Sequence, residues 1–374
     1  MRKLIIVLSV YTFVSISLLG QSLSYKPGGG IKLSNEAEQW SFRTLGYIQS
    51  TFTYHNQKEN GAVDNSFFVR RARLDFIFDY LDKYQLFIEL DGRGGRTELV
   101  LAQVDIEYIE NHKIEVGKFI TPFSPENLRS SRALSTVERY TGLNSMFLLP
   151  GLDTQYGIMF FGKFDKLGYY VSITNGNGKA SDNLAENNNA KDLQFRLEYD
   201  LTNEFKFGGS FNLADELSQN IKLVDHTFES FNSAKINGRR NGYLGYAEFE
   251  NEKFLLRGEA FLYQFNNDLS TEQQIENFFG GYGEIGYFIS GNYSHGLQLI
   301  GRYETARYDN IHQSLNGPTV MNSFIFGPNI YLDGIFRLQI NLIYEKADSP
   351  SLITGRFEGK EDDLQLLTML QIKF

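Results

Sequence analysis

The feature that most constrains the fold of this chain is a strict two-residue alternation through residues 67–80. A period of two separates the two faces of a strand, whereas helical spacing would mix them. One face would carry Ala72, Leu74, Phe76, Phe78 and Tyr80, and the other Val69, Arg71, Arg73, Asp75, Ile77 and Asp79. A soluble sheet would cover the apolar face with a second layer. A transmembrane barrel would turn that face to lipid and the polar face to a wet lumen.

The same alternation recurs to the end of the chain and predicts about sixteen strands in sequence. They cover residues 42–54, 67–80, 84–91, 98–108, 113–119, 155–161, 167–174, 192–199, 204–213, 241–250, 253–263, 278–289, 296–304, 323–332, 335–344 and 364–374. Short connections alternate with long ones, and only residues 92–97 are short where a long connection is due. Short turns on one rim and long loops on the other are typical of outer-membrane barrels. We therefore predict an all-β, transmembrane, antiparallel β-barrel.

The N-terminal region predicts export followed by a lead-in to the barrel. Residues 1–20 join Arg2 and Lys3 to an apolar stretch, as in a secretory signal peptide. A membrane-anchoring helix is the alternative, although the stretch is short for a span of about 20 residues. Residues 21–40 predict a flexible periplasmic lead-in with a short hairpin around 31–33, which leaves residues 41–374 for the barrel. Pro328 falls inside a predicted strand, so either a bulge lies there or that strand is drawn wrongly.

Composition and motifs exclude several classes of function. The net charge of -9 without a dense basic run argues against nucleic-acid binding. The chain has no Cys, and its five His lie in predicted loops or turns without metal-ligand spacing. Neither G-x-S-x-G nor H-E-x-x-H occurs. Residues 281–286 match G-x-G-x-x-G, but they sit in an alternating strand with no helix after it. We expect no enzyme, no metal and no cofactor.

Four segments carry a resemblance to a known family. They are FVRRARL at 68–74, VGKFITPFSPENL at 116–128, VER at 137–139 and QYGI at 155–158. In them the chain resembles the porin O/P family, the phosphate-selective porins of the outer membrane. The resemblance implies a sixteen-strand barrel, usually a trimer, whose third long loop folds inward and narrows the pore. That loop would be residues 120–154 here, and the best-known members line the pore with Arg and Lys and pass phosphate.

The polar faces of the predicted strands supply candidate pore-lining residues. On the lipid face Arg71 or Arg73 would each cost about 2–4 kcal/mol, so both should face the lumen. The pore-lining set comprises Arg71, Arg73, Glu89, Asp91, Asp105, Glu107, Arg196, Arg257, Arg302 and Arg337. The arginines would form an anion-attracting ring, or they would be neutralised by acids on neighbouring strands. Acids match bases on these faces, which departs from a strongly basic conduit and puts a phosphate preference in doubt.

The loop 120–154 carries five further candidates, Arg129, Arg132, Arg139, Glu126 and Glu138. If the loop folds inward, as the resemblance implies, these charges set the field at the narrowest point of the pore. The alternative is that the loop forms an external lid.

These inferences predict an outer-membrane porin of a Gram-negative bacterium, for passive diffusion of small hydrophilic solutes. The resemblance implies a preference for anions such as phosphate. The expected partners are membrane lipid, the solutes, two further copies in a homotrimer, and the barrel assembly machinery, which would read the terminal Phe374. One alternative is a plugged barrel that acts as a scaffold or surface-binding protein, suggested by the long polar loops 175–191 and 214–240. A secreted soluble β-sheet enzyme is the other.

Overall fold

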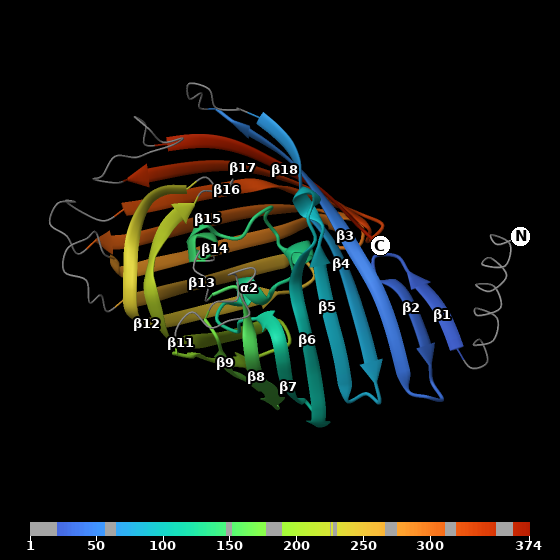
Figure 1. The fold of residues 1–374 in the computed structure, drawn as a ribbon. Helices are drawn as coiled ribbons and strands as arrows, with labels where there is room; N and C mark the ends of the chain where they lie inside the picture. The colour runs from blue at the N-terminus through green and yellow to red at the C-terminus, as the bar shows by residue number, and fades with distance from the viewer. Residues whose placement is uncertain are drawn as a thin grey trace, which may run out of the picture.

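The computed structural model describes residues 21–56, 65–146, 152–176, 189–224, 226, 230–265, 275–310, 319–348 and 362–374. Within these ranges the chain forms a closed antiparallel barrel of sixteen strands, β3 to β18 (Figure 1). Each barrel strand pairs with the next in sequence, and the barrel closes because β18 pairs with β3. The predicted signal peptide, residues 1–20, lies outside the described residues.

All sixteen predicted barrel strands are present. They are β3 (Trp40–His55), β4 (Asn65–Tyr80), β5 (Tyr84–Asp91), β6 (Glu98–Ile109), β7 (His112–Ile120), β8 (Thr154–Phe164), β9 (Leu167–Thr174), β10 (Asp192–Asp200), β11 (Phe205–Val224), β12 (Ser230–Glu250), β13 (Phe254–Phe265), β14 (Ile275–Gly291), β15 (Gly296–Asn310), β16 (Thr319–Leu332), β17 (Phe336–Asp348) and β18 (Asp362–Lys373). The largest difference concerns β11 and β12, which extend well into residues 214–240, predicted as a loop.

The alternation in the sequence becomes an inner and an outer face of the barrel. Apolar members of the alternating set, such as Phe78, Leu86, Leu197 and Phe326, are exposed on the outer surface. Phe42 stacks on Phe76 across β3 and β4, with ring centroids 6.3 Å apart. Charged side chains of the other set are buried toward the lumen. Within the described residues, no helix is long and apolar enough to cross a membrane.

A β-bulge on β4 corrects the predicted faces at the start of that strand. Gln49 on β3 pairs with Arg71, but the next residue, Ser50, pairs with Val69, so Arg70 is the extra residue. A bulge reverses the alternation beyond it. Val69 was predicted on the polar face, whereas the structure exposes it with Phe67. Arg70 turns toward the lumen, where it contacts the long loop.

Most of the N-terminal lead-in forms a hairpin of β1 (Gln21–Lys26) and β2 (Gly30–Asn35). Strands β18 and β2 pair with the same edge of β3. The pairing with β18 ends at Lys373–Tyr47, and the pairing with β2 begins at Ile31–Thr44. The hairpin thus covers backbone groups of β3 that β18 is too short to reach. In Figure 1 it projects from the wall next to the C-terminus.

Strand β16 continues through Pro328, so neither predicted alternative holds there. The register to β17 is unchanged on both sides, at Phe326–Leu342 and at Asn329–Gln339. The paired residues skip only Gly327 and Pro328. Proline cannot donate to the ladder, and a gap of two positions accommodates it without a bulge or a break in the strand.

In its described residues, 121–146 and 152–153, the connection between β7 and β8 contains three short helices, α2 (Pro125–Leu128), η2 (Ser131–Ala133) and α3 (Thr141–Met146). Ser124 caps α2, because its hydroxyl accepts from Asn127 N, and Pro125 occupies the first turn. Buried loop residues Phe123, Tyr140, Leu143 and Met146 pack in one cluster with inward-facing wall residues such as Phe261. An apolar core therefore lies inside the barrel, between this loop and strands β12 to β17.

Candidate functional site

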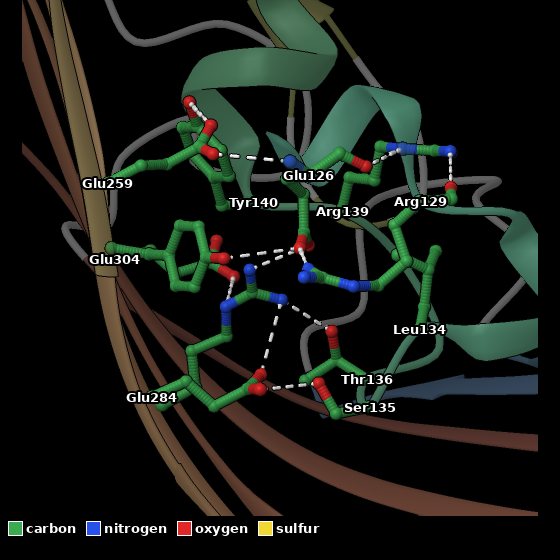
Figure 2. Close-up of polar contacts among 12 residues, drawn as sticks. Glu126, Arg129, Leu134, Ser135, Thr136, Arg139, Tyr140, Glu259, Glu284 and Glu304 are labelled. Carbon is green, nitrogen blue, oxygen red and sulfur yellow. Dashed lines mark hydrogen bonds and ion pairs between the residues drawn. The ribbon is translucent and has the colours of Figure 1, made fainter. Parts of the chain in front are cut away.

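Arg302 on β15 joins the loop between β7 and β8, termed the constriction loop and predicted at residues 120–154, to the inner wall of the barrel. Its guanidinium donates to Glu126 Oε1 at 2.7 Å and to Thr136 Oγ1 at 2.5 Å, and its Nε lies 3.3 Å from Glu304 Oε1. The Tyr282 ring lies beneath it, 3.8 Å from centroid to Cζ. Figure 2 shows Glu126, Thr136 and Glu304 converging on this point. Arg302 faces the lumen as predicted, but its contacts are with protein groups on every side.

Carboxylates on the wall hold the start of the loop. Glu259 on β13 accepts from Ser124 Oγ at 2.6 Å and from Tyr140 Oη at 2.7 Å (Figure 2). Arg129 donates to Glu126 Oε2 at 3.0 Å and to Glu248 Oε1 at 2.5 Å. Burial alone would raise the pKa of Glu126, but the guanidinium groups of Arg302 and Arg129 lower it to about 2. Glu126 is therefore a charged pairing group at neutral pH.

The middle of the loop presents backbone carbonyls to amide and guanidinium groups on the wall. Arg337 on β17 donates to Leu134 O at 2.8 Å, and Gln339 donates to Ser135 O at 2.9 Å. Gln49 on β3 donates to Ser131 O at 3.1 Å. Arg337 is thus buried beneath the loop, and the loop contacts both sides of the barrel closure.

Glu138 holds the loop to β4 through two arginines. Arg70 Nε donates to Glu138 Oε1 at 2.5 Å, and Arg71 Nη2 donates to Oε2 at 3.3 Å. Burial would raise the pKa of Glu138, but Arg70 and Arg71 lower it to about 2. The sequence did not single out Arg70. A strict alternation places the Arg70 guanidinium on the lipid face, where a charge is destabilising. That unfavourable position is the signal in the sequence that could have revealed the bulge.

The predicted arginines on β4 are both paired, although with different groups. Arg73 donates to Glu89 Oε1 at 2.5 Å and to Asp91 Oδ2 at 3.3 Å. Both acids belong to the predicted pore-lining set. Arg71 instead donates to Gln49 Oε1 at 2.9 Å and to Glu138 of the loop. Neutralisation by wall acids therefore holds for Arg73 and is wrong for Arg71, whose partner comes from the loop.

Four predicted wall residues lie away from the loop. Arg196 donates to Glu198 Oε2 at 2.6 Å, and Arg257 donates to Glu250 Oε2 at 2.6 Å. Asp105 accepts from Gln103 at 3.4 Å, and Glu107 lies 3.6 Å from the Lys113 ammonium. Asp105, Glu107 and Lys113 line a cavity of about 510 Å³ beside the short turns, termed the lower cavity.

A second cavity of about 690 Å³ lies between the loop and strands β3 to β6 and is termed the eyelet cavity. Its charged lining consists of Arg70, Arg71, Arg73, Arg93, Arg129, Arg132, Arg139, Asp75, Glu89, Asp91, Glu98, Glu138 and Asp153. The cavity therefore brings together all three arginines predicted on the loop, but most of them are held by protein groups. Arg139, for example, donates to Arg129 O at 2.8 Å and to Glu126 O at 3.1 Å, which braces the loop backbone.

Two arginines of the eyelet cavity are accessible. The side chain of Arg132 is 34% exposed and lies 3.8 Å from its partner Asp75. The side chain of Arg93 is 46% exposed and lies 3.8 Å from Glu98. Sequence reasoning missed Arg93 because the connection that carries it is short and was not recognised as a contributor to the lumen. Asp75 is buried, whereas both members of the Arg93–Glu98 pair are exposed, and an exposed pair at this distance contributes little stability. The guanidinium groups of Arg93 and Arg132 are thus the cations of this cavity most available to a solute.

The connection between β11 and β12 also reaches the lumen. His226 Nε2 lies 3.0 Å from Glu304 Oε2 and 3.7 Å from Glu345 Oε1, and Val224 N donates to Ser145 Oγ of α3 at 3.0 Å. His226 had been predicted in a loop without a role. Across the described part of the chain, no group of three or more His, Asp or Glu is arranged to hold a metal ion.

The comparisons with known proteins agree with this geometry. The family model described as phosphate-selective porin O and P matches residues 42–372. A sequence search of curated proteins finds no match.

Several solved structures share the fold. OmpT of Vibrio cholerae superposes with a TM-score of 0.63 at 9% identity, over 90% of this chain and 98% of that chain. An anion-selective porin from Comamonas acidovorans gives 0.62 at 13% identity, over 90% and 100%. The outer-membrane channel DcaP of Acinetobacter baumannii gives 0.61 at 13% identity, over 90% and 98%. At these identities the similarity establishes the fold alone.

Proposed function

This chain belongs to the family of phosphate-selective porins O and P and is thus an outer-membrane porin. We propose that the eyelet cavity is its solute passage and that its preferred solutes are small hydrophilic anions. The observation that carries this proposal is the position of Arg132 and Arg93, two accessible cations in the lining of the cavity. A narrow passage with low-dielectric walls focuses the field of such charges on a passing ion.

The preference for anions should be modest. The eyelet cavity has seven arginines and six carboxylates in its lining, a formal charge of +1. Arg70, Arg71, Arg73 and Arg129 each lie within salt-bridge distance of a carboxylate. Solutes would cross by diffusion, with selectivity from radius and charge and without turnover. The family and the fold point to a channel rather than an enzyme.

A planar-bilayer recording under a KCl gradient tests the proposal. We expect stepwise conductance with a reversal potential that favours chloride, because the accessible arginines raise the local chloride concentration. Arg132→Gln should move the reversal potential toward potassium. Arg307→Gln is the matched control, since Arg307 is exposed and does not line the eyelet cavity. A potassium-favouring wild type would refute the anion preference.

A plugged barrel is the second candidate. The packing of α3 and of His226 inside the lumen favours it, since both occupy space that a wide pore would leave open. Liposome swelling in small uncharged sugars distinguishes the two. Swelling would require an open passage and would argue against a plugged barrel. Conductance without any swelling would show that only ions pass.

We also propose that the protein is a homotrimer, because one structure of OmpT from Vibrio cholerae is described as a trimer form. Mass measurement in detergent tests this, and a monomeric mass would reject it.

Lipid would contact the exposed apolar outer face. The assembly machinery would read Phe374, whose N–H donates to Gly46 O at 3.0 Å and completes the pairing with β3. Deletion of Phe374 should slow membrane insertion.

A further inference from the structure

The inner wall changes the sign of its charge along the pore. Arg70, Arg71 and Arg73 lie in the half of β4 nearer the long loops, and Asp75 and Asp79 follow toward the short turns. Asp75 and its partner Glu89 still belong to the lining of the eyelet cavity. At the level of Asp79 the carboxylates continue across the strands, because Asp79 pairs with Gln85, Gln85 with Asp105, and Asp105 with Glu115. Arg73 and Asp79 are six residues apart on one strand, about 20 Å at 3.3 Å per residue.

The two cavities lie on either side of this change of sign. The eyelet cavity is bounded by residues at the rim that carries the long loops, such as Glu98 and Asp153, and its formal charge is +1. The lower cavity is bounded by short-turn residues such as Asp82, and its five carboxylates and three lysines give -2. Ile77 and Phe87 pair in register between the two charged levels, so apolar side chains separate them.

We infer that the passage is bipolar, with an anion-attracting part on the side of the long loops and a cation-attracting part on the side of the short turns, and that it therefore rectifies ion current. This inference rests on the proposed function, since it requires the eyelet cavity to be the passage. Short turns face the periplasm in barrels of this kind. The carboxylate level opposes multiply charged anions, so monovalent anions and dipolar solutes pass more readily than dianions.

The direction of rectification follows from the order of the charges. When the periplasmic side is positive, chloride moves from the arginine level toward the carboxylate level, and potassium moves the opposite way. Both ions then accumulate where the two levels meet, and conductance rises. The opposite polarity depletes both ions there, and conductance falls.

Ionic strength determines whether this effect is visible. The screening length is about 10 Å at 0.1 M salt, shorter than the separation of the two levels, so each keeps its own sign. At 1 M salt it is about 3 Å, so the fixed charges act only on ions next to the wall and lose control of the current.

The experiment is a current–voltage recording of the full-length porin, inserted in one orientation, in symmetric KCl at 0.1 M and at 1 M. We expect the current at 100 mV with the periplasmic side positive to exceed that at the opposite polarity by about 1.5-fold or more at 0.1 M, and the ratio to approach 1 at 1 M. A conducting channel with a linear response at 0.1 M would overturn the inference, whereas an absence of conductance would refute the proposed passage itself.

Variants assign the effect to the carboxylates. Asp105→Asn combined with Glu107→Gln removes two charges from the lower cavity with near-isosteric groups, and the current ratio at 0.1 M should fall toward 1. Asp165→Asn is the matched control, because Asp165 lies in the turn between β8 and β9, outside the lining of the lower cavity. Its positive φ of 51° suits asparagine equally well. A ratio unchanged in the double variant would also overturn the inference. Heat-modifiable migration in gels confirms that each variant is folded.

Discussion

At the scale of the residue, Glu138 shows how one loop carboxylate controls two wall cations. Its lowered pKa of about 2 results from Arg70 and Arg71, and the stabilisation is present above its usual pKa and is lost as pH falls from about 4.5 toward 2. Glu138→Gln removes the carboxylate that pairs with both guanidinium groups, at a cost of about 3–5 kcal/mol, less what water in the cavity recovers. The midpoint temperature of thermal unfolding at pH 7 should be lower for Glu138→Gln than for the wild type. On acidification this midpoint should fall by less in Glu138→Gln than in the wild type. Equal pH profiles would contradict this account.

At the scale of the element, the β1–β2 hairpin depends on a close approach at Gly30. Its φ is +82°, and a Cβ there would lie 2.0 Å from Thr44 O. Gly30→Ala should therefore separate β2 from β3 and raise amide exchange at residues 41–44. Gly94→Ala is the matched control, because Gly94 also has a positive φ, +67°, but has open space around it. It should cost only the left-handed backbone strain, about 1–2 kcal/mol. If both variants leave exchange unchanged, the hairpin is held elsewhere.

At the scale of the whole molecule, the constriction loop is bonded to β3, β4 and each of the strands β11 to β18, and Arg302 makes several of these contacts. Arg302→Met would leave Glu126 and Glu304 buried without their shared cation, which removes the arginine's attachment to the loop and leaves the bond from Thr141 N to Glu304 as the contact with β15. We expect the loop to loosen and single-channel conductance in 1 M KCl to rise about two-fold or more, since conductance follows the open cross-section. Arg307→Met, on the same strand but with an exposed pair, should leave conductance unchanged. An unchanged conductance in Arg302→Met would show that the remaining contacts suffice.

The sequence alone predicted all sixteen barrel strands, because alternation is a local property that each strand carries in its own residues. It also placed Arg302 and Arg337 on the inner face correctly. It failed where one extra residue reverses the alternation, as at Arg70 and Val69, because a bulge depends on the partner strand as well as on the strand itself. It failed again at residues 214–240, where strands β11 and β12 run far beyond the predicted loop.

What the sequence determined by itself was the barrel, its two faces and the identity of the charges in its lumen. Only the tertiary structure decided which charges neutralise one another. Arg70 and Glu138 are 68 residues apart in sequence, and Arg302 and Glu126 are 176 apart. No local pattern encodes such a pair, because the contact exists only after the barrel has closed and the loop has packed against its inner wall. The sign of the field at each depth of the pore follows from those pairings, and selectivity is therefore a property of the folded lumen.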